Sequence, residues 1–254
     1  MLLSTDSPET TECTALVTGA SSGIGEATVR ALCARGATVY AAARRLDRLE
    51  QLAEQTGCIA HELDVRDRDA VAAIGAVAPF DVLVNNAGLG RAMGSIWTAP
   101  ADDIERTVDT NVTAAIHVIR AVLPGMVERG RGHIVNMSSV LALRALPTAL
   151  YGATKGAMHM LSRDLRLELS GTGVRVTEIC PGRVATEFYD VAIDEPEARE
   201  ALRNNGCEPL QAGDIADAVM YAVGAPWRVN VALLEILPTE QAYGGVSFVP
   251  AADR

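Results

Sequence analysis

A tyrosine and a lysine stand four positions apart in the segment YGATKGA, at Tyr151 and Lys155. If the segment is helical, residues four apart lie on the same face of the helix, so the ammonium lies near the phenol. A nearby cation favours the phenolate and lowers the pKa of tyrosine from its usual value of about 10. The spacing therefore indicates a tyrosine that acts as a general acid and base. An ordinary amphipathic helix with a surface lysine has the same pattern.

The glycine-rich segment TGASSGIG begins at Thr18 and follows an apolar run. Between a strand and a helix, the glycines at 19, 23 and 25 let the backbone turn tightly and approach a pyrophosphate. Their spacing, GxxxGxG, differs from the GxGxxG of the standard dinucleotide fingerprint. The segment predicts a dinucleotide-binding turn, and a purely structural turn is the alternative.

Arg44 and Arg45 follow the second apolar run, where a protein that binds NAD usually has an acidic residue for the ribose hydroxyls. No acidic residue occurs here before Asp47. A guanidinium matches a phosphate in charge and geometry, so the two arginines predict NADP as the cofactor. Both could instead be solvated residues at the start of a helix.

Six short β-rich runs alternate with helical patterns along the chain. They span residues 14–19, 37–43, 57–64, 81–88, 132–139 and 173–182. This alternation predicts an α/β fold, a single-domain, Rossmann-like, doubly wound parallel sheet flanked by helices on both faces. We expect a flexible N-terminal arm at 1–12, one dinucleotide-binding catalytic domain at 13–254, and a substrate loop or lid at about 183–212. The helical stretch 112–130 is expected to break near Pro124.

Composition and charge restrict the class of protein. Of the 254 residues, 49% are hydrophobic, which is enough for a sizeable core. A net charge of −10 without a basic stripe argues against a nucleic-acid partner. No apolar run reaches the roughly 20 residues of a membrane span, and the N-terminus is unlike a secretion signal. Scattered cysteines and histidines without ligand spacing predict a cytoplasmic protein with reduced thiols and no metal site.

Six segments, in order, resemble the motifs of the short-chain dehydrogenase/reductase family. They are TGASSGIG, NNAG at 85–88, Asn111, the serine pair 138–139, YGATK at 151–155 and PGRVATEF at 181–188. The resemblance spans about residues 13–240. It implies an NADP(H)-dependent oxidoreductase that interconverts a carbonyl and a primary or secondary alcohol by hydride transfer.

The resemblance also implies roles for four catalytic residues. Tyr151 would give and take the proton, and Lys155 would lower its pKa and hold the nicotinamide ribose. Ser139 would polarise the substrate carbonyl, and Asn111 would order a water in the proton relay.

The cofactor site expected from these motifs and the two arginines draws on separate segments between residues 19 and 186. Its residues are Gly19, Ser21, Ser22, Gly23, Ile24, Gly25, Arg44, Arg45, Asp64, Val65, Asn86, Ala87, Gly88, Tyr151, Lys155, Pro181, Gly182, Val184 and Thr186. By resemblance, Asp64 meets the adenine ring, Asn86 lies where the chain passes the cofactor, and Thr186 bonds the carboxamide.

The position of the catalytic serine is open. The usual family spacing to the tyrosine points to Ser138, whereas the distance from Asn111 along the expected strand points to Ser139. Neighbouring side chains on a strand face opposite sides, so only one of the two reaches the substrate. We favour Ser139.

A finer resemblance is to the branch of NADP-dependent 3-hydroxy acid dehydrogenases and secondary-metabolite aldehyde reductases. ARRLDRLEQLAEQ, RAVLPGMVERGRGHIVN and RVNVALLEILPTEQAYGG carry it. It implies a small 3-hydroxy acid or a biosynthetic aldehyde or ketone as substrate, with Arg183 or Arg144 as candidates to bind a carboxylate. It also implies a homo-oligomer, a tetramer rather than a dimer. The alternatives are a non-catalytic NADP-binding regulatory or assembly protein and a sugar-nucleotide epimerase or dehydratase, which we expect to need further C-terminal residues.

Overall fold

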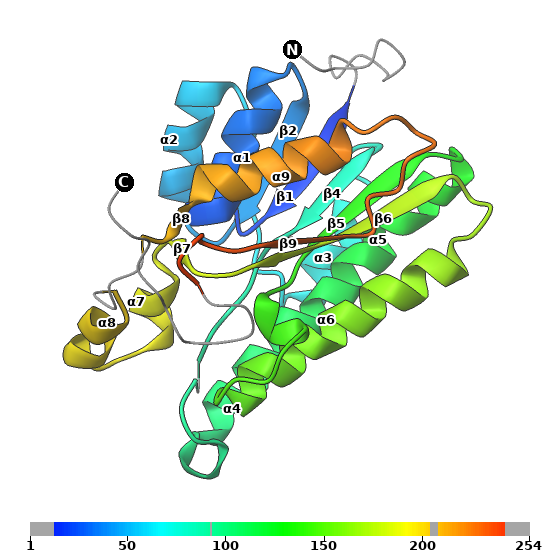
Figure 1. The fold of residues 1–254 in the computed structure, drawn as a ribbon. Coiled ribbons are helices and arrows are strands. Elements are labelled where there is room, and N and C mark those ends of the chain that lie inside the picture. Colours follow the sequence, from blue (N-terminus) through cyan, green and yellow to red (C-terminus); the bar gives the residue numbers. More distant parts are fainter. Residues whose placement is uncertain (1–12, 92, 204–207, 242–254) are drawn as a thin grey trace.

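The computed structural model describes residues 13–91, 93–203 and 208–241, and a parallel sheet runs through them (Figure 1). Its seven strands lie in the order β3-β2-β1-β4-β5-β6-β9. They are β1 (Thr14–Thr18), β2 (Thr38–Ala43), β3 (Ile59–Glu62), β4 (Val82–Asn85), β5 (Gly132–Met137), β6 (Val174–Pro181) and β9 (Leu233–Ile236). A second small sheet pairs β7 (Val184–Ala185) with β8 (Leu210–Gln211). The strand order reverses between β1 and β4, which is where open α/β sheets bind their ligands.

Helices cover both faces of the large sheet. The described helices are α1 (Gly23–Ala34), α2 (Leu46–Thr56), α3 (Arg68–Ile74), α4 (Ala101–Val108), α5 (Ala114–Glu128), α6 (Ala149–Glu168), α7 (Phe188–Ala192), α8 (Pro196–Arg203) and α9 (Ala212–Val223). Short turns lie at η2 (Ile96–Thr98), η3 (Asp109–Thr113) and η4 (Val140–Ala142). Figure 1 shows α1, α2 and α9 on one face, α3, α5 and α6 on the other, and α7 and α8 standing apart next to β7.

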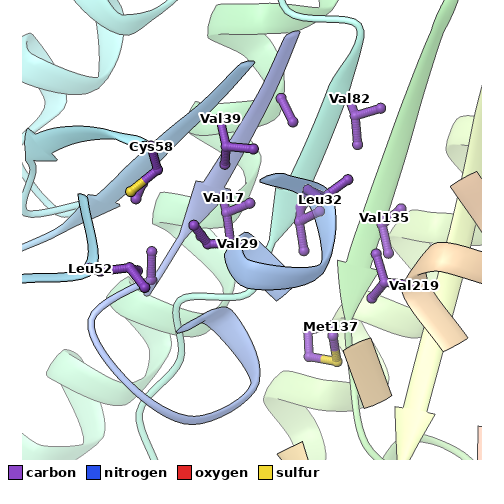
Figure 2. Packing of buried hydrophobic residues seen from close by; sticks show 14 of the residues in the cluster. Val17, Val29, Leu32, Val39, Leu52, Cys58, Val82, Val135, Met137 and Val219 are labelled. Atoms are coloured by element: carbon purple, nitrogen blue, oxygen red, sulfur yellow. The ribbon is translucent and has the colours of Figure 1, made fainter. Parts of the chain in front are cut away.

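The two faces follow from the alternation of side chains along each strand. Val17 of β1 packs with Val29 and Leu32 of α1 in the cluster that Figure 2 shows. Its neighbour Leu16 packs on the opposite face, in the cluster that contains Val118 of α5. Because both faces of the sheet are covered by helices, successive residues of a central strand are mostly buried, and the strand runs are almost continuously apolar.

The predicted fold class is confirmed, and all six predicted strands are present with ends shifted by a few residues. The sequence did not indicate β9. Its four residues lie at the edge of the sheet and are all partly buried, so they give no alternation of buried and exposed positions.

The predicted break near Pro124 was wrong, because α5 continues through this residue to Glu128. Pro124 lies on the exposed side of the helix. The carbonyl that lacks a hydrogen bond, four residues earlier at Arg120, belongs to an exposed residue too, so water can take the place of the missing N–H.

A second correction concerns membrane spans. Among the described residues, the helical run Ala101–Glu128 has the length and hydropathy of a membrane-spanning helix. In the structure, Val118, Ile119 and Val122 of this run are buried in the core beneath the sheet. Packing against the sheet accounts for the apolar residues on this side of the run.

The described cysteines, Cys13, Cys33, Cys58 and Cys180, are free thiols. Cys207 and the predicted arm at 1–12 lie outside the described residues.

Candidate active site

A cavity of about 560 Å³ lies at the carboxyl ends of the strands, and it brings together the segments that the sequence predicted. The predicted residues that line it are Gly19, Ser21, Ser22, Gly23, Ile24, Arg44, Arg45, Asp64, Val65, Asn86, Ala87, Gly88, Ser139, Tyr151, Lys155, Pro181, Gly182, Val184 and Thr186. Two predicted residues, Gly25 and Asn111, lie behind this lining and support it through the contacts described below.

The glycine-rich turn packs so closely on the neighbouring backbone that only glycine fits at two of its positions. Gly19 has a φ of 66°, and a Cβ there would lie 2.9 Å from the Cα of Ala87. A Cβ on Gly25 would lie 2.3 Å from the carbonyl oxygen of Gly19. Helix α1 begins at Gly23, at the cavity, so its N-terminus is placed to attract a pyrophosphate.

Thr18, the last residue of β1, holds this turn against the end of β4. Its Oγ1 accepts hydrogen bonds from the backbone N–H groups of Asn86 and Ala87, both at 3.0 Å. Asn86 returns a hydrogen bond from Nδ2 to the carbonyl of Thr18 at 2.9 Å. Two walls of the cavity are thus one hydrogen-bonded unit. The position of Thr18 before Gly19 is the one feature of the sequence that points to this role.

Arg45 is held at the cavity by three side chains. Its Nε donates to the Oγ of Ser21 at 3.0 Å, and its Nη2 donates to the Oγ of Ser22 at 2.7 Å. Its Nη1 donates to the Oε2 of Glu187 at 2.9 Å. Arg44 lines the same part of the cavity and is exposed. Two cations beside two serine hydroxyls are donors that suit a phosphate group.

Asp64 lies at the rim of the cavity in an ion pair with Arg66. The Arg66 Nη2 lies 2.7 Å from the Asp64 Oδ2, and the Arg66 backbone N–H donates to Oδ1 at 3.0 Å. The hydrogen bonds from Arg66 lower the pKa of Asp64, so this carboxylate stays ionised at neutral pH. Arg66 also lines the cavity and was not predicted.

Tyr151 and Lys155 lie on the first turns of α6, and both are buried. The Lys155 Nζ donates to the carbonyl of Met137 at 3.0 Å and lies 5.6 Å from the centre of the Tyr151 ring. Burial lowers the pKa of Lys155 to about 8. Burial also raises the pKa of Tyr151 above its usual value, because desolvation disfavours the phenolate. The lowering of this pKa by nearby positive charge stays a prediction for the complex with the oxidised cofactor.

Asn111 lies in the π-helical turn η3 between α4 and α5. Its Oδ1 accepts from the backbone N–H of Leu89 at 2.7 Å, and its Nδ2 donates to the Leu89 carbonyl at 2.8 Å. Nδ2 also donates to the Oγ1 of Thr154 at 3.1 Å. Asn111 thus ties the loop after β4 to α6 one residue before Lys155. A π-helical turn often marks a functional site, and here it holds the Asn111 side-chain amide between Leu89 and Thr154.

The two candidate serines make different contacts. Both line the cavity, and the Ser138 hydroxyl donates to the carbonyl of Lys155 at 3.4 Å. The Ser139 hydroxyl caps η4 by accepting from the backbone N–H of Leu141 at 3.2 Å. This contact uses a lone pair of Ser139 and leaves its proton for a ligand in the cavity.

Sequence reasoning missed the residues after Thr186 that line the cavity. The Phe188 ring lies 5.4 Å from the ring of Tyr151, centre to centre, and Tyr189 lies 5.6 Å from Phe188. A Cβ on Gly90 would meet the Phe188 Cζ at 2.2 Å, so Gly90 makes room for that ring. Two adjacent aromatic residues in a chain with only 4% aromatics were the available signal.

Only one of the two candidate carboxylate-binding arginines lines the cavity. Arg183 does so, and it is buried. Arg144 forms an ion pair with Glu235 and is absent from the lining. In the part of the chain that the structure describes, no group of His, Cys, Asp and Glu side chains is arranged to hold a metal ion.

The chain is similar over most of its length to known dehydrogenases. The family described as short chain dehydrogenase matches residues 13–196. The NADP-dependent 3-hydroxy acid dehydrogenase YdfG of Escherichia coli is 40% identical over 245 residues, which covers 91% of this chain and 97% of the relative. Serine 3-dehydrogenase of Rhizobium radiobacter is 36% identical over 240 residues, 91% of this chain and 96% of the relative. A solved structure, the closed form of a serine dehydrogenase complexed with NADP+, is 37% identical with a TM-score of 0.87, and the match covers 94% of this chain and all of that one.

Proposed function

The chain belongs to the short-chain dehydrogenase family, and from this premise we propose that Tyr151 gives and takes the proton in its reaction. The protein is an NADP-dependent oxidoreductase, and this is favoured over a non-catalytic NADP-binding protein. The nicotinamide of bound NADP(H) supplies or accepts the hydride. The observation that carries the proposal is that Tyr151, Lys155 and Ser139 line one cavity with the glycine-rich turn.

In the direction of carbonyl reduction, the raised pKa of Tyr151 keeps its phenol protonated and ready to donate to the carbonyl oxygen. Ser139 donates a second hydrogen bond to the same oxygen as negative charge develops on it. The phenolate that remains is buried, so it needs the nearby Lys155 ammonium, which lies over its ring. Oxidation of the alcohol runs through the same groups in reverse.

We propose a small 3-hydroxy acid as substrate, with a biosynthetic aldehyde or ketone as the alternative. The support is the pair of relatives named for 3-hydroxy acids and serine, together with the buried cation of Arg183 in the cavity lining. A guanidinium binds a carboxylate with two parallel hydrogen bonds. Arg183 would thereby orient the carbon that carries the hydroxyl toward Tyr151.

Steady-state kinetics with Arg183→Gln tests this substrate class. A short 3-hydroxy acid is compared with an alcohol of the same length that lacks the carboxylate, both with NADP+. We expect KM for the acid to rise about tenfold to a hundredfold, the equivalent of one charge-assisted hydrogen bond, with the neutral alcohol unaffected. Equal losses for both substrates would contradict a role in carboxylate binding.

We also propose that residues 13–254 form a single domain in which segment 183–212 closes over the cavity. In support, the segment touches both ends of the site, through Glu187 on Arg45 and Phe188 on Tyr151. Arg91 ties it to the rest of the chain, since its Nη1 and Nη2 each lie 2.6 Å from Asp194. Faster amide exchange of this segment without NADP+ than with it is the expected result. No change on binding would contradict a lid.

A cytoplasmic homotetramer is proposed as the state of the protein, with a dimer as the alternative. Its support is the apolar surface of α6 and α5, where Leu167 is 77% exposed, Met160 52% and Ile116 42%. Burial of such side chains in a partner is a common use of an exposed apolar patch. Light scattering of wild type and Leu167→Glu tests this, and we expect the variant to form smaller assemblies.

A further inference from the structure

Glu187 places a carboxylate on Arg45, one of the two arginines predicted to bind the phosphate of NADP, and on the neighbouring Arg48. Its Oε2 accepts from the Arg45 Nη1 at 2.9 Å, and its Oε1 accepts from the Arg48 Nη1 at 2.7 Å. Glu187 immediately precedes α7, whereas Arg45 and Arg48 lie at the start of α2. The contact therefore joins the cofactor-binding half of the cavity to segment 183–212, across 142 positions of the sequence.

The carboxylate is charged, and it accepts from a guanidinium that an anion would also approach. Hydrogen bonds from Arg48 and Arg45 lower the pKa of Glu187, so it stays ionised at neutral pH. Of the five N–H donors of Arg45, one on Nε donates to Ser21 and one on Nη2 donates to Ser22. A phosphate that approaches this guanidinium meets a like charge on its partner, which is unfavourable at short range. A phosphate that binds Arg45 through Nη1 therefore competes with Glu187 for this group.

We propose that Glu187 is a specificity-determining residue that competes with the 2′-phosphate of NADP for Arg45. The inference rests on the proposed phosphate site at Arg45. NADP(H) binds by displacing the carboxylate from the arginine, whereas NAD(H) has no phosphate and leaves the pair intact. The intrinsic preference for NADP(H) is therefore partly offset by a group of the protein itself.

Phe188, the residue after Glu187, contacts Tyr151. Phe188 packs its ring on Tyr151 and fits closely over Gly90. A shift of Glu187 away from Arg45 therefore acts on a residue that touches the proton donor. Two consecutive residues, Glu187 at the N-terminal cap of α7 and Phe188 at its first position, thus link the adenosine end of the cofactor to Tyr151.

Fluorescence titration of NADPH and NADH into wild type and Glu187→Gln tests the competition without an activity measurement. The glutamine keeps the size of the side chain and removes its charge. Glu187 is 44% exposed, so the fold should tolerate the change, and a thermal melt checks this. Glu54→Gln is the matched control. Glu54 is an exposed residue of α2, and its substitution also removes one negative charge.

We expect Glu187→Gln to bind NADPH about two- to fivefold more tightly than wild type, the range for one partly exposed ion pair. NADH affinity and the Glu54→Gln control should stay within about a factor of two. Added salt should shrink the gain, because exposed charges are screened. Unchanged or weaker NADPH binding, or an equal gain for NADH, would overturn the inference. If wild type itself does not prefer NADPH to NADH, the proposed phosphate site at Arg45 fails instead.

Discussion

Replacing Lys155 by methionine should make the folded protein more stable at neutral pH while it removes activity. Burial lowers the pKa of Lys155 from its ordinary 10.5 to about 8, a difference of about 2.5. At 1.36 kcal/mol for each unit, the buried ammonium destabilises the fold by about 3 kcal/mol. The variant loses the hydrogen bond to the Met137 carbonyl, worth about 1 kcal/mol. Methionine fills a similar volume, so the net gain is about 2 kcal/mol.

The gain should depend on pH in one direction. Below pH 8 the lysine is protonated in both the folded and the unfolded chain, so the wild type carries the full destabilisation. Between pH 8 and 10.5 the folded chain has lost the proton while the unfolded chain still binds it, so wild-type stability rises with pH. The difference between Lys155→Met and wild type therefore shrinks across this range.

Urea unfolding of both proteins, at about pH 7 and about pH 10, measures this difference. Tyr151→Phe serves as the control, since it also removes a group proposed to be catalytic but keeps the ammonium. Lys155 is the only lysine in the sequence, so lysine-labelled protein gives a single side-chain NMR signal that reports its pKa directly. A variant less stable than wild type at pH 7, or a stability difference that does not change with pH, would contradict a destabilising ammonium at Lys155.

Two further substitutions test the supports of the site. Thr18→Val leaves the N–H groups of Asn86 and Ala87 without their acceptor and should lower the free energy of unfolding by about 2–4 kcal/mol. Thr38→Val, at an exposed strand position, is the control and should lower it by less than about 1 kcal/mol. Equal urea midpoints for the two variants would contradict this. Ser139→Ala should lower kcat/KM about 10²- to 10³-fold and Ser138→Ala less than about tenfold, and the reverse order would assign the role to Ser138.

Much of the fold could be predicted because its signals are local. The runs around Leu16 and Leu83 are apolar and short, and glycine-rich or polar residues end them. The spacing of Tyr151 and Lys155 placed both on α6. Strand β9 escaped prediction because an edge strand carries no alternation over four residues.

The limits of prediction at the site have physical causes as well. The contact of Glu187 with Arg45 depends on the path of the chain between α2 and α7, which no local pattern encodes. The pKa of Tyr151 depends also on how deeply the phenol is buried, which the spacing of Tyr151 and Lys155 does not encode. The placement of Phe188 depends on the space above Gly90, which appears only once β4 and β7 are assembled.

The kinetics of Tyr151→Phe test the central claim most directly. The substitution removes one oxygen and keeps the ring that packs on Phe188. With a substrate that wild type turns over, we expect kcat to fall about 10²- to 10⁴-fold, the usual contribution of a general acid or base, while NADPH binds with unchanged affinity in a fluorescence titration. A variant that keeps its kcat within tenfold of wild type would contradict the assignment of the proton transfer to Tyr151.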